Sequence, residues 1–217
     1  QLDSGGAAVH LTPDWLKKCG DAGTYLVIVS PLRDDVPPLL ESAGLTEWIP
    51  IRPNTDTAMM MALAYCVLDE GKQDEAFLAK YCVGWEQFRP YLTGESDGIA
   101  KTPAWAEAIT GVPAERIAQL AREICGTRSM LSAAWALQRA DFGEQPFWAL
   151  IALAAMVGQI GLPGGGFGFG YASLGAHGVP RSQVMWPVFP KAPSPLASFI
   201  PVARISDLLL KPGEEYD

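Results

Sequence analysis

The hydrophobic pattern of the chain begins with short, continuous apolar runs. TYLVIVS (24–30) is rich in β-branched residues and lies between Gly23 and Pro31. Such a run predicts a buried strand of a parallel sheet. EWIPIR (47–52) predicts a second short strand, and SMLSAAW (129–135) predicts a third that returns to the same sheet.

Helical patterns separate these runs. TPDWLKKCGDAG, with Thr12 as its cap and Pro13 in its first turn, predicts a helix directly before the first strand. Apolar residues at helical spacing, together with caps such as Thr102, predict further helices: 57–70 (amphipathic), 74–81, 85–92, 103–110, 114–125 and a largely buried helix within 143–161. Helices and strands in alternation indicate an α/β fold, here an open, Rossmann-like sheet with extra helices.

The end of the chain follows a different pattern. GLPGGGFGFG is a glycine loop, SQVMWPVFPKAPSP is rich in proline, and IPVARISDLLL (200–210) predicts a short helix. Because long irregular stretches are uncommon in compact domains, we expect two parts. Residues 1–160 would form an α/β portion, and residues 161–217 a loop-rich portion that packs against domains outside this sequence. The sequence opens on Gln1 rather than Met, so we expect a piece of a longer protein, with an incomplete fold.

Charge and cysteine content exclude several classes of function. The formal net charge of −8 argues against a nucleic-acid or anionic-membrane partner. No apolar run approaches the roughly 18 residues of a membrane span. The four cysteines lack the spacing of a zinc site, although the sequence leaves a disulfide open. With two histidines in the chain, we expect no metal site made by these residues alone.

Candidate chemistry lies in loops at the predicted carboxyl ends of the strands, where open α/β sheets bind ligands. The first loop starts at Ser30, the second holds Asn54, Thr55 and Asp56, and the third is 135–139. The second loop fits two interpretations, namely simple capping of the following helix or ligand binding through a bidentate carboxylate.

Two further features also fit more than one interpretation. Arg139 either pairs with Asp141 or Glu144 at the surface, or lies in a pocket beside Trp135 and holds an anion or an oxide oxygen. GGGFGFG (164–170) follows a helix and lacks a Lys-Ser/Thr pair, so it fails the phosphate-loop pattern and predicts a flexible or closely packed loop.

Several long segments in fixed order resemble one enzyme family. They are EWIPIRPNTDTAMMMALAY, AFLAKYCVGWEQFRPYLTGESDG, KTPAWAEAITGVPAERI, AAWALQRADFGEQP, AAMVGQIGLPGGGFGFGY and IPVARISDLLLKPG. Together they resemble the dimethyl sulfoxide, trimethylamine N-oxide and biotin sulfoxide reductases, which are bis(molybdopterin guanine dinucleotide) oxidoreductases. The resemblance covers residues 25–217. Family members are roughly 3 to 4 times longer, which implies several domains.

The resemblance implies roles for particular residues. The loop of Asn54, Thr55 and Asp56 would bind the guanine dinucleotide, with Asp56 recognising the base. The resemblance also implies that Val29 and Ser30 line the nucleotide. The residues that would approach the pterin are Trp135, Ala136, Gln138 and Arg139. Of these, Trp135 and Arg139 would also shape the substrate funnel. The molybdenum ligand would lie outside this chain. Two departures are Ser30, where the family often has Asn, and the stretch YASLGAHGVPR, which includes His177.

The activity that the resemblance implies is reduction of S-oxides or N-oxides by oxygen-atom transfer. The full-length enzyme would hold molybdenum bis(molybdopterin guanine dinucleotide), and these residues alone would hold no cofactor and be inactive. The electron donor would be a protein such as a c-type cytochrome, in the periplasm or, for the biotin sulfoxide type, the cytoplasm. Two alternatives stay open: a non-catalytic nucleotide-binding module, and a nitrate- or formate-type enzyme. The WALQR and GESDG segments favour the S-oxide and N-oxide branch.

Overall fold

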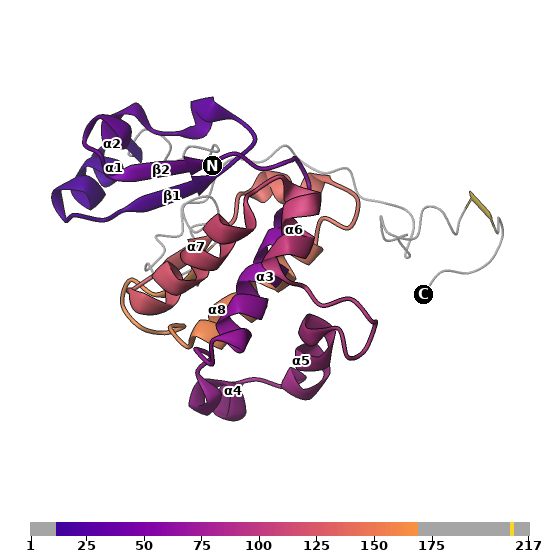
Figure 1. Ribbon diagram of the computed structural model, residues 1–217. Coiled ribbons are helices and arrows are strands. Elements are labelled where there is room, and N and C mark those ends of the chain that lie inside the picture. The colour runs from indigo at the N-terminus through magenta and orange to yellow at the C-terminus, as the bar shows by residue number, and fades with distance from the viewer. Residues whose placement is uncertain (1–11, 169–208, 211–217) are drawn as a thin grey trace, which may run out of the picture. The chain divides into compact units, whose positions relative to one another are not determined.

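The computed structural model describes residues 12–168 and 209–210 (Figure 1). The chain divides into two compact units, residues 1–179 and 180–217. The predicted boundary after residue 160 stays a prediction. The proline-rich segment and His177 lie outside the described residues, and of the predicted helix at 200–210 only Leu209 and Leu210 are described, both helical.

The first unit holds the helices and strands that concern the site. They are α1 (Thr12–Asp21), β1 (Leu26–Val29), the 3₁₀ helix η2 (Arg33–Asp35), α2 (Pro38–Ser42), β2 (Thr46–Ile49), α3 (Asp56–Asp69), α4 (Glu75–Tyr81), α5 (Trp85–Thr93), α6 (Pro103–Thr110), α7 (Ala114–Gly126), β3 (Met130–Ser132), the 3₁₀ helix η3 (Trp135–Arg139), α8 (Gln145–Val157) and β4 (Gly166–Gly168). The helices predicted within residues 12–168 and the first two strands are therefore confirmed to within a few residues. None of the helices that the structure describes combines the length and apolar character needed to cross a bilayer.

The strands form two separate parallel pairs. β1 pairs with β2, with Leu26 opposite Thr46 and Val29 opposite Ile49. β3 pairs with β4 instead of returning to the first pair, so that part of the prediction is wrong. α8 connects β3 to β4, as expected for a crossover between parallel strands. The sequence predicts a loop at β4, because Gly166 and Gly168 carry no side chains and give no alternation of apolar and polar residues.

Helix α3 is the centre of the core. It packs against α5, α6, α7 and α8 (Figure 1). The sequence predicts an amphipathic helix, but α3 is buried on more than one side, because Ala62 and Cys66 are enclosed as well as the expected apolar residues. Burial raises the pKa of the Cys66 thiol to about 11, so this side chain stays protonated and acts as a packing group. All four cysteines of the chain are free thiols.

The GESDG segment folds around a buried lysine. Lys101 is 2% exposed, and its ammonium donates to Asp97 Oδ2 at 2.7 Å and to the carbonyl of Ile99. The same ammonium lies 4.1 Å from the ring centroid of Tyr91, a cation–π contact. At Gly94, with φ of +81°, an added Cβ would lie 2.4 Å from the backbone nitrogen of Ala100. This segment therefore secures the connection between α5 and α6, and the contacts described here are structural.

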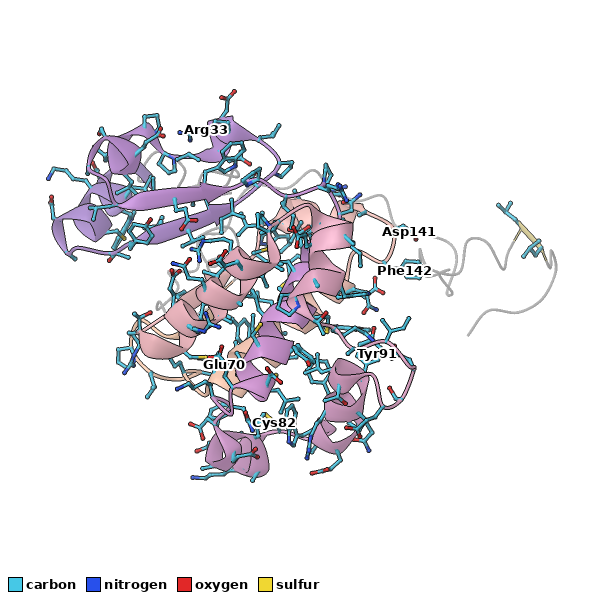
Figure 2. All side chains as sticks on the ribbon, viewed as in Figure 1. Arg33, Glu70, Cys82, Tyr91, Asp141 and Phe142 are labelled. Carbon is cyan, nitrogen blue, oxygen red and sulfur yellow. The ribbon has the colours of Figure 1, made fainter. Side chains whose placement is uncertain are left out.

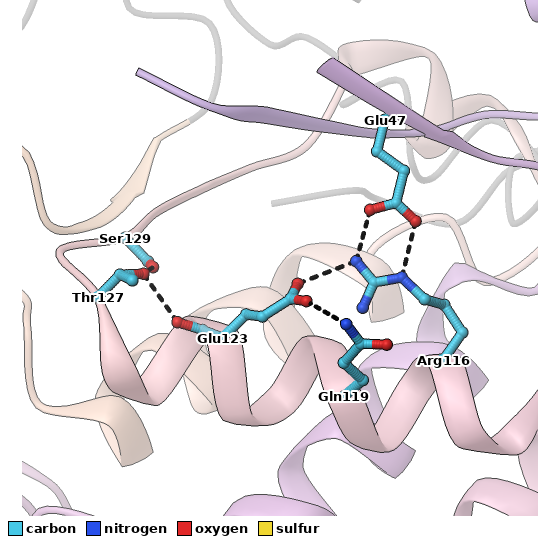
Figure 3. Close-up of polar contacts among 6 residues, drawn as sticks. All are labelled: Glu47, Arg116, Gln119, Glu123, Thr127 and Ser129. Carbon is cyan, nitrogen blue, oxygen red and sulfur yellow. Dashed lines mark hydrogen bonds and ion pairs between the residues drawn. The ribbon is translucent and has the colours of Figure 1, made fainter. Parts of the chain in front are cut away.

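Arg116 on α7 joins the first strand pair to the helices (Figure 3). Its Nε and Nη2 donate to the two carboxylate oxygens of Glu47 on β2 at 2.7 and 2.6 Å, and Nη2 also donates to Glu123 at 2.9 Å. The hydrogen bonds to Glu47 raise the pKa of Arg116 well above its usual range. Such a planar, bidentate pair fixes orientation as well as adding charge-assisted hydrogen bonds.

We predict that Arg116→Met lowers the free energy of unfolding by about 1–3 kcal/mol, because two partly buried carboxylates lose their donor. Urea denaturation of the chain measures the change. The matched control is Arg122→Ala, which removes an exposed pair with Glu70 and should cost at most about 0.5 kcal/mol. Equal effects of the two substitutions would contradict a joining role for Arg116.

Candidate functional site

A cavity of about 410 Å³ lies between the start of α3 and the segment that joins η3 to α8. Two segments that are distant in sequence make its walls, and Figure 2 labels Asp141 and Phe142 of the second one. Its lining residues are Asn54, Asp56, Thr57, Leu137, Ala140, Asp141, Phe142, Gly143, Gln145 and Pro146. This volume is in the range of small-ligand pockets.

Both walls hold a strained residue. Asn54 has φ of +63° and Phe142 has φ of +52°, and among the described residues these are the non-glycine positions with positive φ. For an ordinary L-residue this conformation costs on the order of 1–2 kcal/mol, less for Asn. Such strain persists where the surroundings impose it, and it concentrates at ligand-binding sites. Its occurrence on both walls of one pocket marks this pocket as the candidate site.

The first wall presents the carboxylate of Asp56, the first residue of α3. Burial raises the pKa of Asp56, and its own backbone N–H opposes this only in part. Within the described residues, no other group donates a hydrogen bond to this carboxylate. Asp56 is half-buried, so its carboxylate is partly desolvated, and a ligand that brings N–H groups would be favoured here.

The loop before Asp56 is anchored to the end of α6. Arg52 Nη1 donates to the carbonyls of Ala108 and Ile109 at 2.8 and 3.0 Å, and the Arg52 backbone N–H donates to Thr110 O at 2.9 Å. A guanidinium at a helix C-terminus satisfies carbonyls that lack partners within the helix. Arg52 thereby places the wall on a rigid helix, a role that sequence analysis did not assign.

The capping interpretation of the Asn-Thr-Asp loop is wrong for Thr55. This residue holds the cap position of α3, but its side chain makes no capping hydrogen bond. Its hydroxyl instead donates to Arg52 O at 2.7 Å and closes the loop on itself. Asp56 is the acidic residue of the first turn of α3, and its ligand-binding interpretation stays a prediction.

The second wall depends on the absence of a side chain at Gly143. An added Cβ there would lie 2.5 Å from Gln138 O and 2.8 Å from Gln138 Cα, closer than atoms can pack. Gly143 therefore lets the backbone fold directly over the end of η3, and its N–H donates to Ala140 O at 3.1 Å. This close approach positions Asp141 and Phe142 in the pocket.

Two other predicted site residues, Val29 and Ser30, do not line this pocket. They lie at the end of β1, where Ser30 is buried and its hydroxyl is bonded to Asp35 and accepts from Leu32 N at 3.1 Å. The Ser30 carbonyl accepts from Trp48 Nε1 at 2.9 Å. Its polar atoms are thus committed within the protein.

The predicted residues of the third loop, Trp135, Ala136, Gln138 and Arg139, form η3 and flank the pocket-lining Leu137. Trp135 Nε1 is buried without a hydrogen-bond partner. Arg139 is exposed and makes no ion pair with Asp141 or Glu144, so the alternative of a surface pair is wrong. Both side chains keep hydrogen-bonding capacity that a ligand could use.

Sequence analysis missed most of the second wall, namely Ala140, Asp141, Phe142, Gly143, Gln145 and Pro146. The signal that was present is a glycine directly after an aromatic residue and three positions before a proline. A close backbone approach at such a glycine depends on the tertiary fold and cannot be read from spacing.

The charge of the lining restricts the class of ligand. Two of the ten lining residues are aspartates and none is Lys or Arg. A phosphate would be repelled from these walls, whereas a group with N–H donors would be attracted. The pocket therefore suits a polar, donor-bearing ring or amine better than an anion. No cluster of three or more potential metal ligands occurs in the part of the chain that the structure describes.

We predict that Gly143→Ala destabilises the chain by about 1–3 kcal/mol, because the new methyl group forces the wall away from Gln138. Gly126→Ala is the control, since a Cβ at that helical position meets nothing within 4 Å. That substitution should be neutral or stabilise by roughly 0.5 kcal/mol. Chemical denaturation measures both, and a neutral Gly143→Ala would show that the close approach is absent.

The chain is similar to known proteins along most of its length. Residues 7–215 match the family model described as molybdopterin oxidoreductase. The chain is 49% identical over 216 residues to biotin sulfoxide reductase from Cereibacter sphaeroides, covering all of this chain and 28% of that protein. It is 46% identical over 177 residues to trimethylamine-N-oxide reductase 1 from Escherichia coli K12, covering 76% of this chain and 21% of that protein.

Two further similarities agree with these. Dimethyl sulfoxide/trimethylamine N-oxide reductase from Rhodobacter capsulatus is 42% identical over 206 residues, with 90% of this chain and 24% of that protein covered. The chain thus spans about a quarter of the length of these relatives. Acetylene hydratase from Pelobacter acetylenicus has a solved structure that matches 70% of this chain and 20% of its own, with a TM-score of 0.59. Its 21% identity supports the fold alone.

Proposed function

Because the chain belongs to the molybdopterin oxidoreductase family, we propose that it forms the part of a molybdenum reductase that binds the guanine end of a pterin dinucleotide. The observation that carries the proposal is the Asp56 carboxylate, half-buried in a pocket that holds no Lys or Arg. The pocket suits the guanine base of such a cofactor, and the phosphates of the cofactor would lie outside the pocket.

Guanine fits the Asp56 wall by its chemistry. Its Watson–Crick edge carries two adjacent N–H donors, and an ionised carboxylate accepts two donors with its two oxygens. The exposed ring of Phe142 offers an aromatic surface on the opposite wall. Asn54 and Thr55 complete the loop, Asn54 by lining the pocket and Thr55 by closing the turn.

We assign the other predicted residues to the rest of the cofactor and to the substrate. Trp135, with its unpartnered Nε1, and its neighbours Ala136 and Gln138 would approach the pterin. Arg139, which makes no ion pair with any described residue, would hold an oxide oxygen at the substrate funnel. Val29 and Ser30 would line the nucleotide by van der Waals contact, because the hydroxyl and carbonyl of Ser30 are already bonded to Asp35 and Trp48.

The full-length protein would reduce S-oxides or N-oxides, as the names of its relatives indicate. When bound, the molybdenum centre would supply two-electron oxygen-atom transfer, and the protein would bind, orient and exclude water. Strands from the rest of the protein would complete the two parallel strand pairs and give an open, Rossmann-like sheet. A c-type cytochrome as electron donor and a periplasmic location are further parts of this proposal.

We predict that Asp56→Asn reduces the affinity of the full-length protein for its guanine dinucleotide by about ten- to a hundred-fold, because the amide cannot accept two N–H groups as a carboxylate does. Guanine retained after exhaustive dialysis measures the loss. Asp141→Asn is the control, since it removes an exposed carboxylate of the same pocket. If both variants retained guanine like the unmodified protein, Asp56 would not recognise the base.

Because the pKa of Asp56 is raised, guanine retention by the full-length protein should depend on pH. The ligand needs the ionised carboxylate, so retention should be full above the raised pKa and should fall as the pH drops through it. Guanine release over a pH series measures the effect. The Asp56→Asn variant should lack this dependence, and a parallel fall in that variant would assign it to another group.

A further inference from the structure

One face of α8 is exposed although the helix has the composition of a buried one. Its 13 residues, QPFWALIALAAMV, include no charged side chain. Its inner face packs against α3 and includes Leu150, Leu153 and Met156. On the other face Trp148 is 61% exposed and Ile151 is 37% exposed. These residues are three positions apart, so they are neighbours on one stripe of the helix surface.

Helix α7 shows what a solvent-facing helix looks like in this chain. It also packs against α3, but its exposed positions carry Glu115, Gln119 and Arg122. A helix that is apolar on all sides is normally covered on all sides. The exposed stripe of Trp148 and Ile151, called here the α8 stripe, therefore differs from an ordinary surface and needs a partner.

We propose that the α8 stripe is covered, in the full-length protein, by an apolar element of the same polypeptide that lies outside these 217 residues. The length of the relatives supports this occupant, because the chain spans 21–28% of three of them and most of each protein lies outside the matched region. This inference rests on family membership and does not depend on which ligand the pocket binds.

The position of the α8 stripe supports an element of the same protein over a chance partner. Gln145 and Pro146, at the start of α8, line the candidate pocket, and Phe142 next to them is exposed. A cofactor site needs walls that keep water out. Because the start of α8 lines the pocket, an element of the same polypeptide that covers α8 would also lie beside the second wall.

The test places p-benzoylphenylalanine, a photoreactive aromatic residue, at position 148 of the full-length protein. After irradiation, peptide mass spectrometry identifies the segment joined to this position. We expect an intramolecular crosslink to an apolar segment outside these 217 residues, unchanged in yield on tenfold dilution. Position 83 is the control, because Val83 is fully exposed and should give no intramolecular crosslink.

Three results would overturn the proposal. A crosslink to a segment within the 217 residues would show that the chain covers its own stripe. A covalent dimer whose yield falls on dilution would assign the stripe to contact between two copies. The absence of any crosslink would indicate an open surface, provided that the protein is folded.

Hydroxyl-radical oxidation of the unmodified full-length protein gives an independent result that needs no substitution. Trp148 should be oxidised at least five times more slowly than in the denatured protein. Tyr81, which is 65% exposed, should show little protection. Equal protection factors at the two residues would contradict a cover over α8.

Discussion

The burial of α3 is the constraint on which the rest of the described structure depends. A helix so apolar is stable only when other helices enclose it, and α5, α6, α7 and α8 do so. The first residue of the helix, Asp56, is half-buried, and this partial desolvation raises the pKa of its carboxylate. The contacts of Arg52 with the end of α6 and of Arg116 with Glu47 then fix the preceding loop and strand. The same packing thus forms the core and leaves the Asp56 carboxylate without a hydrogen-bond donor from another described residue.

The second wall of the pocket supplies the complementary feature. Phe142 is held in a strained conformation beside Gly143, which the backbone of Gln138 approaches too closely for any side chain. Backbone strain concentrates at ligand-binding sites, and a lining with two aspartates and no cation suits a neutral, donor-bearing ring. The geometry and the family relationship therefore support one proposal from independent directions: the protein holds a cofactor, and the cofactor carries the chemistry.

Much of this fold was predictable from local patterns, and the exceptions have physical causes. Thr102 caps α6 as predicted, accepting from Trp105 N at 3.2 Å, because capping depends on residues close in sequence. The pairing of β3 with β4 was not predictable, since Gly166 and Gly168 give no strand pattern. In the site, Asn54 and Asp56 were found because they precede a recognisable helix. The wall formed by Phe142 and Gly143 was missed, because its shape comes from a backbone contact that only the folded chain creates.

The most direct test of the central proposal uses the full-length gene product, purified from a molybdenum-replete host. Molybdenum per polypeptide is measured by elemental analysis, together with the guanine nucleotide that acid treatment releases. The account predicts one molybdenum and two guanines per polypeptide, as a bis(guanine dinucleotide) cofactor requires. A folded protein that contains neither molybdenum nor guanine would contradict it.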